Sequence, residues 1–519
     1  MTFSSPDFNP EHPVADVAKE LVAFFEKSSF TPDGLAAFLG PEVTDALHRG
    51  EPAAVARAAT GESTLDWLIR FFILHESHPA TVFADVMGSV LATKLVDAQV
   101  AYSDPLGVVT VAIDIRPHVI AGRNRWVFSD VDAAMVDHVP GRDHVLGVGA
   151  ATLSLLRSTP CSPVDTVLDL GTGSGAQTLG QLDFARHIVA TDVHPRALQL
   201  AEATLVGAQG ADKVDIVQGS WFEPVQGQRF DRIVANPPFV VGMPEVGHVY
   251  RNSGLNLDEA SELVVSQAAN HLNDGGTAHL LAAWIHTPEQ SWQQRVASWI
   301  PDHGVSAWIL QRDVADPALY VSTWLKDESI DIRSPEGKAK AKLWLDHLAE
   351  NQVTGIGFGF VALHKIDEET PSEVVAEEIP QAFDDALGPE VMEHFAISAW
   401  LRSLLPDELG DKKFGLRSGV AKEEVSIANE DMGFGFTPVV TRLTRTEGPR
   451  WSHEVDEHLA AIVAGLNPDG LNLRETIELY AMAKGYDPDA MISEATPAII
   501  DLARHGIVYP AELPPRCHI

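Results

Sequence analysis

An apolar run that leads straight into three alternating glycines limits what this chain can fold into more than any other feature of its sequence. Residues 167–170 read Val-Leu-Asp-Leu, and residues 171–175 read Gly-Thr-Gly-Ser-Gly. Glycine lets the chain turn sharply and bring backbone N–H groups against a ligand, because no Cβ stands in the way. The sequence therefore predicts a strand, a tight ligand-binding turn and then a helix.

Strand-like and helix-like segments alternate on both sides of this turn. Such alternation predicts a parallel sheet whose strands are joined by crossover helices. We therefore predict an α/β fold, with a Rossmann-like doubly wound, mostly parallel sheet, over residues 141–365. Residues 318–325 and 355–365 are expected to be its closing strands. The other strand-like runs are residues 166–170, 187–193, 214–219, 232–235 and 277–285, and the helix-like runs are residues 195–208 and 257–272.

Four regions flank the predicted sheet domain. Residues 1–87 carry apolar side chains at three- and four-residue intervals, which predicts an N-terminal helical domain. Residues 88–140 contain β-rich runs and predict a β-hairpin that links the domains and contacts substrate. Residues 366–393 hold ten Asp or Glu and no Lys or Arg, so we expect an acidic linker region. Residues 394–519 are expected to form a mixed C-terminal domain with a winged-helix-like unit, used for packing or partner binding.

Charge and cysteine content restrict the compartment and the partners. The 519 residues include 37 Lys and Arg against 73 Asp and Glu, a formal net charge of −36. A field of that sign repels a phosphate backbone unless a local basic patch overrides it. The net charge therefore disfavours nucleic acid as a partner but does not exclude it. Cys161 and Cys517 are far apart without metal-ligand spacing, so neither a metal site nor a disulfide is expected. Without a secretory signal or a long apolar run, we expect a cytoplasmic protein with no membrane partner.

A basic island in the predicted hairpin is the exception to this acidic character. It consists of Arg116, His118, Arg123 and Arg125, with no acidic residue between them. Such an island is either a solvated face of the hairpin or a substrate contact, and the sequence leaves both interpretations open.

Two aspartates accompany the glycine turn. Asp169 lies just before it, where an acid can pair with a cationic amino group but would repel a pyrophosphate. Asp192 ends the next predicted strand, where an acid can accept hydrogen bonds from both ribose hydroxyls, although it could also cap the helix that begins at Pro195. A nucleoside that bears an amino acid fits both aspartates. S-adenosylmethionine is such a ligand, and it also carries a positive sulfonium.

The segment after the third predicted strand is expected to lie near the adenine of that ligand. Ser220 can accept a hydrogen bond there, and Trp221 or Phe222 can pack near the base or belong to the core. The glycine spacing is GxGxG, which differs from the GxGxxG of dinucleotide-binding folds and from a triphosphate-binding loop.

Asn236-Pro237-Pro238-Phe239 is the most specific chemical signal and directly follows the strand-like residues 232–235. Two prolines cannot continue a strand ladder, so they fix a rigid turn at the carboxyl end of the strand, where α/β folds build their ligand crevice. An Asn side-chain oxygen and a Pro carbonyl can each accept an N–H of a planar NH2 group and orient its nitrogen. Phe239 would stack on the planar group. No general base with a shifted pKa is required.

Together these residues resemble the class I S-adenosylmethionine-dependent methyltransferases. The chain is most similar to the group that contains the HemK-type release-factor glutamine methyltransferases and the small-domain ribosomal RNA guanine methyltransferases. The resemblance covers residues 140–290, less than half of the chain. It implies S-adenosyl-L-methionine as cofactor and N-methylation as the reaction. Its cofactor-binding residues would be Asp169, Gly171, Thr172, Gly173, Gly175, Asp192, Val193, Ser220, Trp221 and Asn236, and its catalytic residues Asn236, Pro237, Pro238 and Phe239.

The acceptor of the methyl group stays open at this point. Ser220 replaces an acid expected in the family, and Phe239 stands where glutamine methyltransferases usually have Tyr and RNA guanine methyltransferases commonly have Phe. Global charge favours a protein. A protein glutamine or similar amide, for example in a translation factor, is therefore our first expectation, and an exocyclic amine of an RNA base is the second.

Other interpretations stay open beside the enzyme. The N-terminal helices and the hairpin would select the substrate, whereas residues 249–254 would be either a substrate lid or an ordinary loop. A non-catalytic cofactor-binding scaffold is the alternative outside enzymology. The oligomeric state is not indicated by the sequence.

Overall fold

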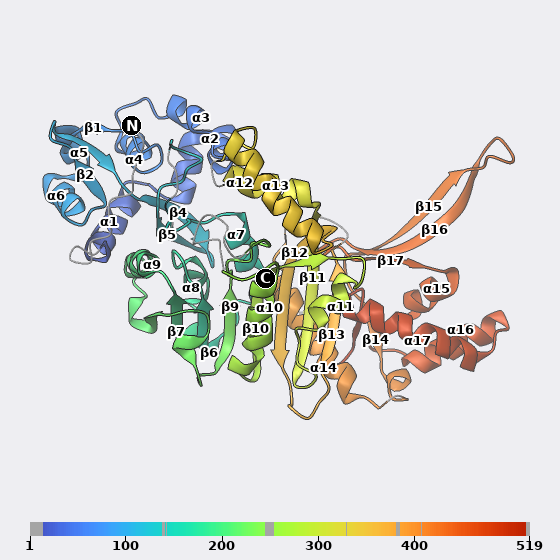
Figure 1. Ribbon diagram of the computed structural model, residues 1–519. Helices are drawn as coiled ribbons and strands as arrows, with labels where there is room; N and C mark the ends of the chain where they lie inside the picture. The colour runs from blue at the N-terminus through green and yellow to red at the C-terminus, as the bar shows by residue number, and fades with distance from the viewer. Residues whose placement is uncertain are drawn as a thin grey trace. The chain divides into compact units, whose positions relative to one another are not determined.

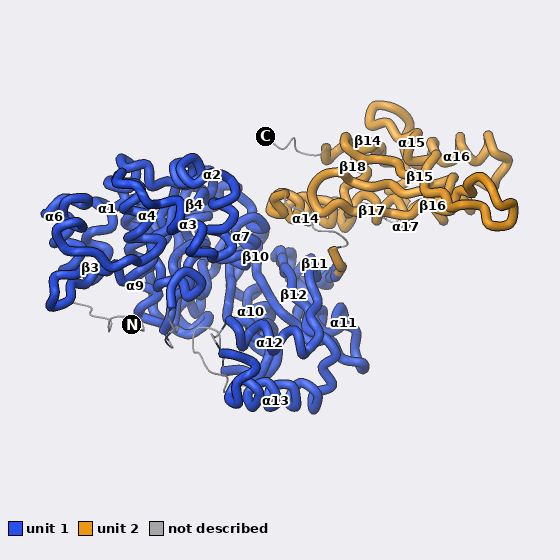
Figure 2. Tube along the Cα trace, turned by 90° about the horizontal axis from the view of Figure 1, so that it is seen from above, with its two compact units in different colours: residues 1–376 blue, residues 377–519 orange. Residues whose placement is uncertain are grey.

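The computed structural model describes residues 14–137, 141, 143–243, 254–327, 330–379, 385–405 and 407–514. Two compact units divide the chain, residues 1–376 and residues 377–519 (Figure 2). Residues 244–253 lie outside the described residues, and so do Cys517 and all but the last residue of the expected lid at 249–254. No helix of the described part is long and apolar enough to cross a bilayer.

An eight-stranded sheet forms the centre of the first unit (Figure 1). Its order is β13-β11-β12-β10-β9-β6-β7-β8. The run from β10 to β8 pairs in parallel, and β12 pairs antiparallel with both β10 and β11. This confirms the Rossmann-like, mostly parallel sheet. The strands are β6 (Val164–Leu170), β7 (Ala185–Asp192), β8 (Val214–Gln218), β9 (Phe230–Ala235), β10 (Leu272–His286), β11 (Val305–Ala315), β12 (Gly355–Lys365) and β13 (Glu373–Glu378).

The prediction of a closing strand at residues 318–325 is wrong, because these residues form the helix α12 (Pro317–Asp327). Asp316 begins the helix by accepting hydrogen bonds from the N–H groups of Ala318 and Leu319. Tyr320, Val321 and Leu325 are then buried on one face, a helical spacing that an apolar run of this length also allows. The strand expected at 355–365 is confirmed as β12. In addition, β13 occupies residues 373–378 of the expected linker.

Helices pack against the strands of the sheet and against one another. An N-terminal group of six helices shares a buried core with α9, through Ala197, Leu200 and Ala203. The helices of this first unit are α1 (Ala15–Lys27), α2 (Pro32–His48), α3 (Pro52–Ala58), α4 (Thr64–Phe72), α5 (Ala80–Met87), α6 (Ser89–Asp97), α7 (Ala150–Ser158), α8 (Ala176–Gln181), α9 (Pro195–Gly207), α10 (Glu259–Ala268), α11 (Trp292–Ala297), α12 and α13 (Pro335–Glu350).

The remaining strands of the first unit form two small sheets. One has the order β1-β3-β2, with β1 (His78–Pro79), β2 (Ala101–Ser103) and β3 (Val108–Val111). The other is the predicted hairpin, β4 (Asp114–Ile120) with β5 (Arg123–Ser129). Ala121 and Gly122 join its strands with φ of 52° and 72°, and two residues of positive φ suit the tight turn of a twisted hairpin.

The second unit has its own core, to which α14–α17 and the strands around them contribute (Figure 2). Its helices α15 to α17 follow one another along the chain and are followed by the strand β18. The long hairpin β15–β16, whose turn projects away from these helices (Figure 1), was not expected. The elements are α14 (Gly388–Ser403), β14 (Phe414–Leu416), β15 (Val420–Ala428), β16 (Phe436–Arg445), β17 (Ser452–Val455), α15 (Glu457–Gly465), α16 (Leu473–Lys484), α17 (Pro488–Arg504) and β18 (Val508–Pro510).

Candidate functional site

A cavity of about 910 Å³ lies in the first unit at the carboxyl ends of β6, β7 and β9. Volumes of this order are typical of small-molecule and cofactor sites. The carboxyl ends of parallel strands share one edge of a sheet, so motifs far apart in sequence meet there. The sequence-predicted residues that line the cavity are Gly171, Thr172, Gly173, Asp192, Val193, Ser220, Trp221, Asn236, Pro237, Pro238 and Phe239.

The glycine turn has the conformation that its sequence demands. Gly171, Gly173 and Gly175 have φ of 73°, 55° and 83°, a left-handed region that costs other residues energy. At Gly175 space is limiting as well, since an added Cβ would lie 3.3 Å from the Cα of Ala201 in α9. The turn is therefore fixed by backbone conformation at its first two glycines and by close helix packing at the third.

Asp169 lies behind the turn and is not among the residues that line the cavity. Its side chain is fully buried, and its Oδ2 accepts hydrogen bonds from the Thr172 hydroxyl at 2.7 Å and the Thr178 hydroxyl at 2.6 Å. Its Oδ1 has no hydrogen-bond partner within the described chain. Burial raises the pKa of the Asp169 carboxyl to about 6, against the hydrogen bonds from Thr178 and Thr172 that lower it. One carboxylate oxygen thus holds the loop, and the other can accept from a ligand.

Asp192 ends β7 on the wall of the cavity. Its Oδ2 accepts a hydrogen bond from the Gly173 N–H at 3.0 Å, and its Oδ1 accepts one from the His194 N–H at 2.9 Å. The second bond reaches His194, the N-cap residue of α9, and no described side chain caps the helix itself, so the structure does not show the alternative in which Asp192 caps α9. Each carboxylate oxygen can accept more than one bond, so Asp192 couples the glycine turn to α9 and still presents acceptors to the cavity.

The segment after β8 divides between the cavity and the core. Ser220 and Trp221 line the cavity, and Trp221 has a φ of 47°. Phe222 is buried and stacks on His271 with ring centroids 4.6 Å apart. Of the two aromatic residues considered for the adenine region, the structure therefore places Trp221 at the cavity and Phe222 in the core.

Asn236 to Phe239 leave β9 at its carboxyl end, between the glycine turn and the end of β10. Pro237 is buried, whereas Asn236, Pro238 and Phe239 are half-buried. All four residues line the cavity. The tetrapeptide and the glycine turn thus border the same space.

The hairpin β4–β5 separates the basic island into two parts. Arg116 and His118 line the cavity, whereas Arg123 and Arg125 are not among its lining residues and both contact Asp183, at 3.1 Å and 3.0 Å. The island is therefore neither one solvated face nor one continuous basic patch.

Acidic groups also neutralise the part of the island that lines the cavity. The Arg116 guanidinium lies 2.8 Å from Asp114 Oδ2 and 3.2 Å from Asp132 Oδ2. Burial lowers the pKa of the His118 imidazole to about 4, and the Arg116 charge acts in the same direction, so His118 is neutral near pH 7.

Several lining residues carry no motif and were missed by sequence reasoning. They come from β4, from the segment after β5 and from α12, and only the tertiary fold brings them to the cavity. They include Asp114, Asp132, Asp143, His144, Trp324, Lys326 and Asp327.

Comparison with known proteins agrees with this fold and site. Residues 146–290 match the family model "Methyltransferase small domain". Residues 27–111 and 392–510 match the models "Domain of unknown function (DUF7059)" and "Domain of unknown function (DUF7782)". Residues 146–290 contain the glycine turn with Asp169, the aspartate Asp192, the segment Ser220 to Phe222 and the tetrapeptide Asn236 to Phe239.

Curated relatives match through the same central part of the chain. A release factor glutamine methyltransferase of Moorella thermoacetica is 31% identical over 123 residues, covering 23% of this chain and 42% of that protein. A ribosomal RNA small subunit methyltransferase C of Escherichia coli is 30% identical over 172 residues, covering 32% of this chain and 45% of that protein. The chain thus spans less than half the length of these relatives. A T. thermophilus 16S rRNA N2 G1207 methyltransferase, solved with AdoMet and guanosine, is 20% identical, covers 42% of this chain and 57% of that chain, and has a TM-score of 0.26.

A doubly wound sheet with the glycine turn, Asp192 and the Asn-Pro-Pro-Phe turn on one cavity defines a class I methyltransferase domain, the class that uses S-adenosylmethionine. Residues 146–290 of this chain match the methyltransferase small-domain model, which covers less than half of the chain. The resemblance to the glutamine and ribosomal RNA methyltransferases is confirmed.

The described residues fit S-adenosylmethionine. Gly171 and Gly173 leave open space where a Cβ would stand, Asp192 offers acceptors at the end of β7, and Asp169 Oδ1 is a buried acceptor without a donor in the described chain. An ammonium and a ribose diol supply the donors that these oxygens lack.

Proposed function

We propose that this protein transfers the methyl group of S-adenosylmethionine to a planar nitrogen, with a protein glutamine or similar amide as the first candidate acceptor. One observation carries the proposal: the glycine turn, Asp192 and Asn236 to Phe239 all border a single cavity. A site that only bound the cofactor would need the first two features, whereas the tetrapeptide adds oriented acceptors for an NH2 group.

Different residues of the chain bind different parts of the cofactor. Asp192 accepts hydrogen bonds from the ribose hydroxyls. Asp169 Oδ1 and the backbone of the glycine turn hold the amino-acid part, and Ser220 and Trp221 border the adenine. Bound S-adenosylmethionine supplies an electrophilic methyl group on a positively charged sulfur.

The tetrapeptide orients the acceptor. Asn236 Oδ1 and the Pro237 carbonyl each accept one N–H of the planar NH2, which aims the nitrogen lone pair at the methyl carbon. Bound S-adenosylmethionine would give up its methyl group to the nitrogen and its sulfur would keep the electrons of the broken bond, while the two acceptors would stabilise the positive charge that grows on nitrogen. The nitrogen then loses one proton to water. Pro237 and Pro238 keep the turn rigid, and Phe239 packs on the planar group.

A base amine of RNA is the second candidate acceptor. Phe239 and the similarity to a ribosomal RNA methyltransferase favour it. The net charge of −36 opposes it, and so do the carboxylates that neutralise Arg116, because a polyanion is attracted only where positive charge is left uncompensated. A cofactor-binding scaffold without catalysis leaves the acceptor geometry of Asn236 and Pro237 without a role.

Calorimetric titration with S-adenosylhomocysteine tests the cofactor half of the proposal. We expect micromolar binding by the wild type and a loss of at least about tenfold in Asp192→Ala, because the variant lacks two charged acceptors. Asp215→Ala is the matched control, since Asp215 is an exposed acid at the other end of the parallel strands and pairs only with the surface residue His187. A folded wild type that does not bind would refute the proposed function.

Labelled methyl donor then tests the acceptor half. Release factors and ribosomal RNA are the two substrate panels, and Asn236→Ala is expected to abolish incorporation while binding of S-adenosylhomocysteine persists. Incorporation into RNA alone would replace the first candidate acceptor by the second.

A further inference from the structure

The helices α12 and α13, which join β11 to β12, reach the cavity from outside the methyltransferase small domain at residues 146–290. Trp324, Lys326 and Asp327, in the last turn of α12, line the cavity together with Phe239. The two helices pack side by side (Figure 1). The last turn of α12 therefore forms part of the cavity wall that the tetrapeptide also borders, and α13 packs against α12.

The helix pair holds the chain directly after the tetrapeptide. The Val241 N–H donates a hydrogen bond to the Tyr320 hydroxyl at 2.6 Å, and the Val241 carbonyl accepts one from the Trp344 indole at 3.1 Å. The next residue, Gly242, packs against the same indole, since an added Cβ would lie 2.9 Å from the Trp344 Nε1. Both backbone groups of the residue two positions after Phe239 are thus fixed by α12 and α13.

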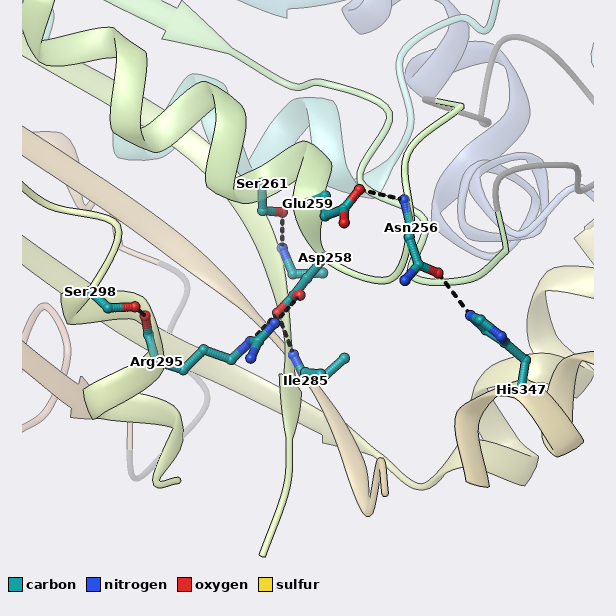
Figure 3. A network of polar contacts seen from close by, with 9 residues as sticks. Asn256, Asp258, Glu259, Ser261, Ile285, Arg295, Ser298 and His347 are labelled. Atoms are coloured by element: carbon teal, nitrogen blue, oxygen red, sulfur yellow. Dashed lines mark hydrogen bonds and ion pairs between the residues drawn. The ribbon is translucent and has the colours of Figure 1, made fainter. Parts of the chain in front are cut away.

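The same helices hold the chain where it returns to α10 (Figure 3). His347 of α13 contacts Asn256 Oδ1 at 2.8 Å, and Leu257 donates its N–H to the Gly242 carbonyl at 2.7 Å. Asp258, which is 2% exposed, accepts hydrogen bonds from Arg295 and from the Ile285 N–H of β10. The chain is therefore anchored to rigid elements both at Val241 and Gly242 and at Asn256 to Asp258.

An aromatic cluster makes this anchoring stiff. Buried Tyr320 lies 5.9 Å from Trp344 and 6.0 Å from Trp324, between ring centroids, in edge-to-face arrangements, and it stacks on Phe358 at 5.7 Å. Phe239 packs against the same cluster. Aromatic pairs in such geometries add to the stability that burial alone provides. Phe239 and Trp324 thus belong to one packed body and both border the cavity.

The charged side chains of the cavity wall bear on the choice of acceptor. Among the described residues outside the cofactor motifs, those that line the cavity are Asp114, Asp132, Asp143 and Asp327 against Arg116 and Lys326, four carboxylates and two cations. Arg116 is already paired with two of those carboxylates. This part of the wall therefore repels phosphate and tolerates neutral or cationic groups.

We infer that Phe239 and Trp324 border an acceptor subsite for a neutral planar amide presented by a polypeptide, and that Trp324 of α12 determines its specificity. The inference rests on the proposed function and adds to it the residues and the helix pair that select the acceptor. Asn236 and Pro237 bind the N–H groups of the amide, while the aromatic faces hold its plane.

The test uses the full chain saturated with S-adenosylhomocysteine. Two probes are titrated by saturation-transfer NMR: N-acetyl-glutamine N-methylamide and guanosine 5′-monophosphate. We expect the amide to bind the wild type more tightly than the nucleotide. Trp324→Ala should weaken amide binding about fivefold, the value of one aromatic face, and Trp324→Phe should restore most of it. Leu319→Ala, on an exposed position of the same helix, should leave it unchanged.

The outcomes separate this inference from the function on which it rests. Unchanged binding of S-adenosylhomocysteine in all variants, with amide binding weakened about fivefold only in Trp324→Ala, supports the subsite. Equal amide binding by Trp324→Ala and the wild type, no amide binding by the wild type, or tighter binding of the nucleotide would each overturn it while the cofactor assignment stands. A wild type that does not bind S-adenosylhomocysteine would overturn both.

Discussion

At the scale of single residues, Asp169 shows how one buried carboxylate can fix a ligand-binding turn with one oxygen and keep the other as an acceptor. Its Oδ2 holds Thr172 and Thr178, and this fixes the glycine turn. Its Oδ1 is left for a donor. The sequence predicted the acid and its position, but not its full burial, because burial depends on how α8 and α9 close over the strand.

The raised pKa of Asp169 predicts a pH-dependent stability. Its folded-state pKa of about 6 exceeds the value of 3.8 for an unperturbed Asp side chain, so the folded state binds more protons between these values, and the contribution of this group to stability falls as pH rises through that window. The isosteric variant Asp169→Asn lacks this titration. We expect the unfolding free energy of Asp169→Asn, taken relative to that of the wild type, to rise by on the order of 2 kcal/mol as the pH is raised from 4 to 7. Urea unfolding at several pH values measures this difference, and a constant difference would contradict it.

At the scale of elements, the sequence predicted those features of the fold that depend on residues close together in the chain. The strand that enters the glycine turn, the alternating crossovers and the rigid proline turn all depend on neighbours in sequence. The helix α12 was misread as a strand because Leu319, Tyr320 and Val321 are apolar in succession, and only the cap at Asp316 indicated a helix. The contributions of β4 and α12 to the cavity have no local signal, since long-range packing alone places Arg116 and Trp324 there.

The docking of α8 on α9 gives a prediction at this scale. Gly175→Ala should lower the unfolding free energy by about 1–2 kcal/mol for its left-handed conformation, and further because the new Cβ would press on Ala201. Gly107→Ala is the control, since Gly107 has a similar φ of 74° but open space around its Cβ position. Chemical unfolding of both variants measures the difference. Equal destabilisation would mean that helix packing at Gly175 contributes nothing.

At the scale of the whole molecule, each compact unit has its own buried core. Residues such as Leu168, Ile233 and Leu280 form the core under the sheet of the first unit, and residues such as Ile477 and Ile499 form that of the second. Charge and composition indicated a large acidic protein of several domains. The division at residue 376 falls within the acidic segment 366–393 that was predicted as a linker, whereas the strand β13, which extends the sheet into this segment, was not predicted from its acidic composition.

This division predicts that the cofactor site works without the second unit. Every residue that lines the cavity lies before residue 328, and a fragment of residues 1–379 keeps the whole of β13 in the sheet. We expect this fragment to fold and to bind S-adenosylhomocysteine with a dissociation constant within about twofold of that of the full chain, because no lining contact is removed. Circular dichroism and calorimetry measure folding and binding on the same sample. If the fragment folds but binds at least about tenfold more weakly, which corresponds to 1.4 kcal/mol, the second unit must stabilise the binding-competent state of the cavity, and the acceptor assays would then require the full chain.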